Sequence, residues 1–141
     1  AGSSADVDLT AMALTALAPY ASADARVRQA VERALSRLSA MQEENGGFAS
    51  WGTENSESCA QVVVALSALG IDAASDSRFV KSGNSALDAL CTFGLDGGGL
   101  RHTAEETASN GMATEQGYYA LTAYHRFLSG QPRLFDMSGG R

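Results

Sequence analysis

An internal repeat constrains the fold of this chain more than any other feature of its sequence. Three short segments of nearly the same sequence, ALTAL, ALSAL and ALTAY, begin at positions 13, 65 and 120. A leucine and a glycine pair recur between them, as Leu38 with GGF at 46–48 and as Leu90 with GGL at 98–100. A period of about 50 residues is typical of stacked supersecondary units. The sequence therefore predicts repeated units of a helix, a turn, a second helix and a glycine-rich segment that leads back to the next unit. We call this last segment the return, and the two returns contain residues 46–48 and 98–100.

The predicted helices are of two kinds. Residues 8–18, 57–70 and 114–128 carry apolar side chains on nearly every face, which is typical of helices covered on all sides. Residues 25–41 have one apolar stripe opposite a charged face, and residues 84–93 are a shorter helix with an apolar stripe. We therefore expect three inner helices and two outer helices that alternate along the chain.

Alternating inner and outer helices form a ring of helical hairpins around a central space. The fold class that we predict is all-α, a partial α/α toroid of about two and a half helical-hairpin repeats. So few repeats cannot close a ring, because each repeat buries its faces only against its neighbours. We expect residues 1–141 to form one domain that is a fragment of a longer chain or assembles with copies of itself, with residues 1–5 a disordered or cloning-derived end.

Composition and charge exclude several kinds of partner. A chain of 141 residues, 45% hydrophobic and 18% charged, suits one globular domain. Its formal net charge of −6 argues against nucleic acid, because phosphate binding needs clustered Lys and Arg. The longest uncharged stretches, residues 9–23 and 58–71, are too short and too polar to span a bilayer. We therefore expect neither nucleic-acid binding nor membrane insertion.

Several motifs resemble those of a known superfamily. Residues 6–12 resemble the Asp-x-Asp-Asp-Thr-Ala signature of squalene-hopene-type terpene cyclases. Residues 41–48 resemble the Gln-x-x-x-Gly-x-Trp repeat of these proteins, with Phe in place of Trp. Overall the chain is most similar to bacterial secreted or surface proteins with prenyltransferase-like repeats, through the phrases GGFASWGTEN, ESCAQ and MATEQGYYAL. The resemblance implies a toroid and a secreted or cell-surface location.

The acidic motif has two interpretations, one catalytic and one structural. In the cyclases the middle Asp of the signature is the general acid, so the resemblance implies that Asp8 protonates the substrate and that Asp6 orients it. Leu9 replaces the next Asp, which removes one carboxylate from the cluster. The other interpretation is that Asp6 and Asp8 cap a helix and compensate its dipole, as Glu57 and Glu115 would at the starts of the other inner helices.

The same resemblance indicates which residues would form a metal site. Prenyltransferases of this fold hold zinc with Asp, Cys and His. Here Glu57, Cys59 and either His102 or His125 give a ligand set only with Glu in place of Asp, so we expect no metal. Cys59 and Cys91 fall at apolar positions and are expected to be small buried residues, with a disulfide or a reactive thiol as alternatives. The glycine-rich turns lack the lysine of a phosphate-binding loop and are expected to end helices.

Polar and aromatic side chains in the inner helices are candidates for lining the central space. Gln61 and Gln116 occupy equivalent repeat positions. Four more candidates on the last inner helix combine apolar surface with a polar tip: Tyr118, Tyr119, Tyr124 and His125. The alternative is that these amides satisfy backbone groups and the aromatic residues pack in the core. Phe48 and Trp51 are expected to wedge between hairpins, with surface recognition as the alternative for Trp51.

Two hypotheses of different classes follow. The first is a non-catalytic, extracellular or cell-surface repeat module that acts as a scaffold or binds an unknown small ligand or protein, without a cofactor, as a homo-oligomer or as part of a longer toroid. The second is a class II terpene-cyclase-like enzyme, or a fragment of one, that uses Asp8 as the acid. A third idea, based on the related toroid of vertebrate cobalamin carriers, is carriage of a cobalamin-type ligand.

Overall fold

The computed structural model describes residues 6–136 and is mostly helical over that range. The expected disordered end at residues 1–5 lies outside the described residues. The elements are α1 (Val7–Leu17), η1 (Ala18–Tyr20), α2 (Ala25–Met41), β1 (Ala49–Ser50), β2 (Thr53–Glu54), α3 (Ser56–Ala68), η2 (Ser77–Phe79), β3 (Val80–Lys81), β4 (Asn84–Ser85), α4 (Ala86–Cys91) and α5 (Gly111–Leu128). Each strand pair, β1 with β2 and β3 with β4, is a short antiparallel hairpin.

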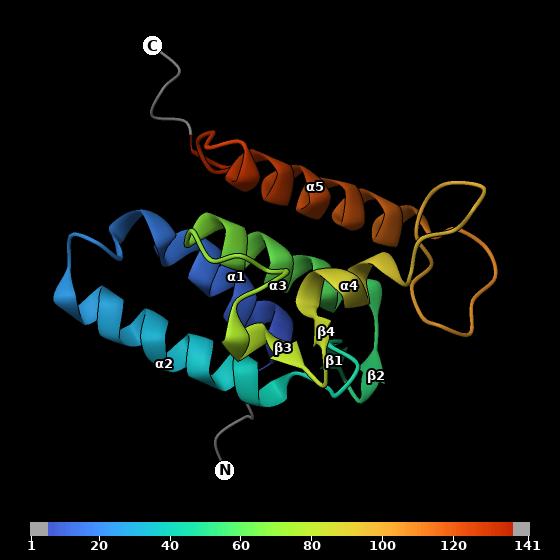
Figure 1. Ribbon diagram of the computed structural model, residues 1–141, viewed down its shortest axis with the longest axis horizontal. Helices are drawn as coiled ribbons and strands as arrows, with labels where there is room; N and C mark the ends of the chain where they lie inside the picture. Colours follow the sequence, from blue (N-terminus) through green and yellow to red (C-terminus); the bar gives the residue numbers. More distant parts are fainter. Residues whose placement is uncertain (1–5, 137–141) are drawn as a thin grey trace.

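The helices α1, α3 and α5 lie side by side with α3 in the middle, and α2 and α4 pack against this row. Helix α3 packs against α1 on one side and α5 on the other, while α2 packs against α1 and α4 packs against α3 (Figure 1). The predicted mostly helical fold is therefore confirmed, and we keep the names inner helices for α1, α3 and α5 and outer helices for α2 and α4. The bounds of α2 coincide with the predicted residues 25–41.

Burial differs among the three inner helices. Ten of the 13 residues of α3 are buried, as expected for a helix covered on all sides. Helices α1 and α5 bury one side each, through small residues such as Ala11 and Ala120. The expectation of complete burial is therefore wrong for α1 and α5. The reason is that each has a neighbouring inner helix on one side only within the described part of the chain, so Leu9 and Met12 of α1 remain exposed.

Backbone hydrogen bonds from each glycine-rich return fix the start of the next inner helix. The Phe48 carbonyl accepts from the backbone N–H of Asn55 at 3.3 Å, and the Leu100 carbonyl, 52 positions later, accepts from that of Asn110 at 2.8 Å. Asn55 and Asn110 are the N-cap residues of α3 and α5, where their side chains accept from backbone N–H groups of the first turn. The repeat in the sequence is thus a repeat of helix-starting contacts.

Two predicted helix starts are wrong, and local capping explains both. Helix α5 begins at Gly111 rather than at residue 114, because Asn110 caps it, and Glu115 therefore lies beyond the first turn. Helix α4 begins at Ala86 rather than at residue 84. Ser85 and Asp88 form a reciprocal capping box there, so the preceding residues are free to form the β3–β4 hairpin.

Close packing at two glycines positions the returns. Gly46 has φ +85°, and a Cβ at this position would approach the Ser85 carbonyl oxygen to 2.5 Å, so the first return packs directly on β4. A Cβ on Gly117 would approach the side chain of Leu100 to 2.4 Å, so the second return packs directly on α5. The buried Gln42 side chain reinforces the first contact by donating to the carbonyls of Gly46 and Phe79 at 2.9 Å.

Phe48 and Trp51 lie three residues apart but differ completely in burial, and this difference predicts opposite effects on stability. Phe48 is fully buried, as expected for a wedge between hairpins, whereas Trp51 is 97% exposed, so the expectation that it also packs between hairpins is wrong.

We expect Phe48→Ala to lower the free energy of unfolding by about 3–5 kcal/mol, because it opens a cavity in the core. Trp51→Ala should change it by no more than about 0.5 kcal/mol. Urea denaturation followed by circular dichroism checks both, and comparable losses would contradict this assignment.

Candidate functional site

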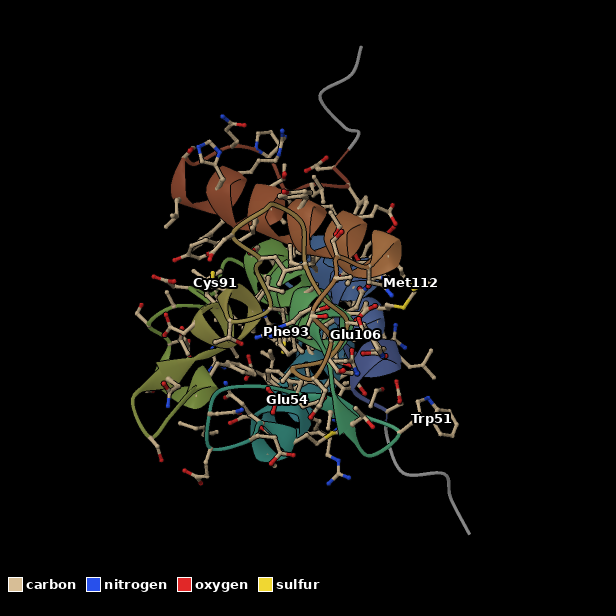
Figure 2. All side chains as sticks on the ribbon, turned by 90° about the vertical axis from the view of Figure 1, so that its right-hand side faces the viewer. Trp51, Glu54, Cys91, Phe93, Glu106 and Met112 are labelled. Carbon is tan, nitrogen blue, oxygen red and sulfur yellow. The ribbon has the colours of Figure 1, made fainter. Side chains whose placement is uncertain are left out.

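The N-terminal ends of α1, α3 and α5 meet at one end of the molecule, together with the β1–β2 hairpin and the loop that precedes α5 (Figure 2). A pocket of about 470 Å³ opens there, which we call the N-terminal pocket. It collects polar side chains from all three inner helices, and the following residues are those that the argument uses: Asp8, Met12, Ser50, Trp51, Glu57, Gln61, His102, Met112 and Gln116.

The two glutamines at equivalent repeat positions contact each other. Gln61 Nε2 donates a hydrogen bond to Gln116 Oε1 at 3.0 Å and a second, short one to the hydroxyl oxygen of Tyr119. Burial raises the pKa of Tyr119 above its ordinary value, so the phenol stays protonated and can itself donate. Gln116 Nε2 and Gln61 Oε1 have no hydrogen-bond partner among the described residues. One donor and one acceptor are therefore available to a molecule in the pocket.

The other three predicted ligand-binding residues lie elsewhere. Tyr118 is exposed, and its hydroxyl accepts from the backbone N–H of Gly99 at 3.4 Å. The Tyr124 hydroxyl donates to Asp72 at 2.9 Å, and burial together with this carboxylate raises the pKa of Tyr124 to about 12. His125 is exposed on α5. The structure therefore brings Gln61, Gln116 and Tyr119 together but separates them from the remaining candidates.

The carboxylates of Asp6 and Asp8 both lie within hydrogen-bond distance of the hydroxyl group of Ser50. Ser50 Oγ lies 2.9 Å from Asp6 Oδ2 and 3.1 Å from Asp8 Oδ2. A serine hydroxyl carries one hydrogen, so it can donate to only one of the two carboxylates at a time. Asp6 also caps α1 by accepting from the backbone N–H of Leu9 at 3.1 Å, which confirms the capping interpretation for this residue. Asp8 Oδ1 is buried without a hydrogen-bond partner among the described residues.

Glu57 and His102 form a second polar pair at the pocket. His102 Nδ1 lies 2.7 Å from Glu57 Oε2, which also accepts from the Ser56 hydroxyl at 3.0 Å. The backbone of the same loop is fixed there as well, because the His102 carbonyl accepts from the Ser56 N–H at 3.0 Å and the His102 N–H donates to Glu106. The sequence brought Glu57 and His102 together only as members of the candidate zinc set, whereas in the structure the two side chains contact each other directly across 45 positions.

The zinc ligand set is not assembled. Over residues 6–136, no group of three or more His, Cys, Asp or Glu side chains is arranged to hold a metal ion. Cys59 is fully buried in the core, and this burial raises the pKa of its thiol to about 12. Cys91 is exposed, so the expectation that it is buried is wrong. None of the described helices has the length and hydrophobicity needed to cross a membrane.

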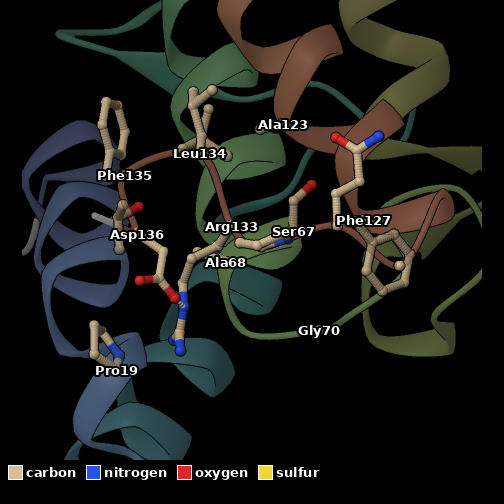
Figure 3. Close-up of a pocket in the computed structure, with 15 residues that line it drawn as sticks. Pro19, Ser67, Ala68, Gly70, Ala123, Phe127, Arg133, Leu134, Phe135 and Asp136 are labelled. Atoms are coloured by element: carbon tan, nitrogen blue, oxygen red, sulfur yellow. Dashed lines mark ion pairs between the residues drawn. The ribbon is translucent and has the colours of Figure 1, made fainter. Parts of the chain in front are cut away.

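A second cavity lies at the opposite ends of the inner helices. It has a volume of about 600 Å³ and is closed by residues 130–136, with Phe135 and Asp136 on one side and Phe127 on the other (Figure 3). Its hydroxyl groups are already used within the helices, because Thr15 bonds the Ala11 carbonyl and Ser67 bonds the Val63 carbonyl. This cavity therefore offers a mostly apolar surface, and none of the predicted site residues lines it.

Comparison with known proteins gives one match. The family model described as the squalene-hopene cyclase C-terminal domain matches residues 3–107, which include α1 to α4 and most of the loop before α5. The matched range contains Asp6, Asp8, Gln61 and His102 but not Gln116. No curated protein and no solved structure matches the chain.

The contrast between the two cysteines predicts selective thiol labelling. Thiolates rather than thiols react with iodoacetamide, so the buried Cys59 with its raised pKa should be inert in the folded protein at about pH 8. The exposed Cys91 should react. Mass spectrometry should detect one label in buffer and two in concentrated urea, and Cys91→Ser should abolish labelling in buffer. Labelling of Cys59 at a rate close to that of Cys91 would contradict the burial of α3.

Proposed function

This chain belongs to the squalene-hopene cyclase C-terminal domain family, and we propose that it uses the terpene-cyclase-like fold as a non-catalytic scaffold or ligand-binding module. The observation that carries this proposal is the contact between Gln61 and Gln116, which joins two repeat units at the N-terminal pocket. A half-buried amide pair with one free donor and one free acceptor suits recognition of a polar group on a ligand.

The rest of the N-terminal pocket favours a small amphipathic ligand. Met12 and Met112 supply flexible apolar walls. Tyr119 does not line the pocket, but its hydroxyl group accepts a hydrogen bond from Gln61 and so helps to hold the amide in place. The pocket volume of about 470 Å³ lies within the usual range for small-molecule sites. The ligand would place a hydroxyl or carbonyl group against Gln61 and Gln116 and its apolar part against the methionines.

The exposed apolar residues beside the acid cluster support binding over cyclisation. Protonation of an alkene needs a strong acid in a cavity that excludes water. Beside Asp8, however, the wall of the pocket includes the fully exposed Trp51. Leu9, which stands where the cyclase signature has its last Asp, is 69% exposed. The third carboxylate of the signature is thus replaced by an apolar side chain that lies largely in solvent.

The secreted or cell-surface location is also proposed, on the resemblance to bacterial surface proteins with similar repeats. Localisation of the full-length protein in cell fractions would test it independently of any ligand.

Binding of farnesol, a linear amphipathic terpenoid alcohol, tests the ligand proposal. The single tryptophan, Trp51, lines the pocket, so its fluorescence reports occupancy directly. We expect a saturable change in emission, and we expect Gln61→Leu or Gln116→Leu to weaken binding by about 3–10-fold, the effect of one lost hydrogen bond. Gln29→Leu, on the exposed face of α2, is the matched control and should bind normally.

Cyanocobalamin forms a second arm of the same experiment, read through its visible spectrum. A response to cyanocobalamin but not to farnesol would favour the carrier hypothesis. The absence of a saturable response to either probe would contradict the small-ligand proposal.

A cyclase activity is the second candidate, and one observation favours it. Asp8 Oδ1 is buried without a partner among the described residues, as expected of an oxygen that acts on a bound substrate. If Asp8 is the acid, incubation with linear terpenoids should give cyclic products, and Asp8→Asn should reduce their formation by at least about 100-fold. Gas chromatography with mass spectrometry detects the products. Product formation that is unchanged in Asp8→Asn would exclude this role.

A further inference from the structure

Four large apolar side chains are exposed around the N-terminal pocket. Leu9 is 69%, Met12 54%, Trp51 97% and Met112 62% exposed, and we call this group the apolar rim. Trp51 and Met112 both stand at the right-hand edge of the molecule in Figure 2 and point away from the ribbon. Exposed Trp and Met side chains that gather at one place are typical of protein interaction sites.

The position of Trp51 is not explained by the stability of the fold. Trp51 has φ +54° and Gly52 has φ +82°, so both central residues of the β1–β2 turn are in the left-handed region. Asn and Gly are preferred there, and a side chain with a Cβ and a bulky ring strains the backbone. The corresponding turn of the β3–β4 hairpin has the small residues Ser82 and Gly83. Trp51 is thus held in a strained turn and buries nothing in return.

The surface beside Trp51 is extended and acidic. A groove of about 1010 Å³ runs along α1 and shares Asp8, Ser50 and Trp51 with the N-terminal pocket, so the two hollows adjoin at these residues. Together they are lined by Asp6, Asp8 and Glu57, and among the described residues neither hollow is lined by a Lys or an Arg. His102, the one basic group, is already paired with Glu57.

We propose that the apolar rim docks an extended segment of a partner protein in which an Arg or Lys side chain stands between apolar residues. The cationic group would lie between Asp8 and the face of Trp51, where a carboxylate and a cation–π contact act together. The apolar neighbours would cover Leu9 on one side and Met12 and Met112 on the other. Two adjoining hollows suit an extended chain that crosses Trp51 better than they suit one small amine.

A second copy of this chain fits this surface less well. The chain carries a formal net charge of −6, so two copies repel each other. Its exposed arginines on α2 include Arg28, Arg33 and Arg37, and their neighbours on that face are polar or small rather than large and apolar. Arg126 and Arg133 do stand beside apolar residues, but Arg126 donates to the Pro132 carbonyl and Arg133 pairs with Asp136 of the same chain. The inference goes beyond the proposed function, since it assigns a protein partner to the rim rather than a small ligand to the amide pair.

Fluorescence of the single tryptophan tests the docking proposal in the whole chain. The probes are the peptide acetyl-Ala-Phe-Arg-Lys-Leu-Ala-amide and its neutral analogue acetyl-Ala-Phe-Gln-Gln-Leu-Ala-amide. We expect the basic peptide to shift Trp51 emission to shorter wavelength saturably and to protect the indole from acrylamide. The neutral analogue should bind at least about tenfold more weakly, and added salt should weaken the basic peptide.

Matched variants assign the binding to this surface. Asp8→Asn and Leu9→Ser should each weaken the basic peptide, whereas Asp96→Asn removes the same charge from an exposed turn outside the rim and should leave binding unchanged. Circular dichroism verifies that each variant is folded. Equal affinity for the two peptides, equal effects of Asp8→Asn and Asp96→Asn, no response of Trp51, or an emission shift on self-association of the protein alone would each overturn the proposal. Farnesol binding is measured separately, so either proposal can fail without the other.

Discussion

The architecture depends on one repeated contact, in which the return of one unit holds the N-cap of the next inner helix. The Phe48 carbonyl fixes Asn55, and the Leu100 carbonyl fixes Asn110. Because each return leads back to the same end of the molecule, the N-terminal ends of the inner helices gather there. Helix N-termini carry partial positive charge, so carboxylates are favoured at that end. The polar site is thus a consequence of how the repeats are connected.

Sequence reasoning succeeded where the information is local or periodic. Helix α2 was predicted to the residue because its apolar stripe lies opposite a charged face. The repeat also identified Gln61 and Gln116 as equivalent residues, although the hydrogen bond between them was not predicted. It failed where burial depends on how many helices pack against a helix. The apolar faces of α1 and α3 look alike in sequence, yet Leu9 is exposed and Val63 is buried, because α3 alone among the helices of residues 6–136 has an inner helix on both sides.

The contacts that shape the site could not be read from the sequence. Ser50 reaches Asp6 and Asp8 across more than 40 positions, and His102 reaches Glu57 across 45. Each depends on the path of a short return, which is set by glycines and hairpin turns rather than by a periodic pattern. The exposure of Trp51 has the same origin, since the turn geometry of β1–β2 and not its hydrophobicity decides where the indole lies.

One side chain in each return bonds to carboxylates at the start of an inner helix, so this role is repeated in both units. Ser50 and His102 are 52 positions apart, the same offset that separates Phe48 from Leu100. In each unit this residue bonds to carboxylates at the start of that unit's own inner helix, Ser50 to those of α1 and His102 to that of α3. The backbone contact is constant while the side chain differs, so the repeat keeps the fold and lets the chemistry vary. Among the described residues the α1 acids therefore have a neutral hydroxyl group beside them, whereas the α3 acid has an imidazole. The carboxylates without a basic side chain as a neighbour thus lie beside Trp51 rather than evenly around the pocket.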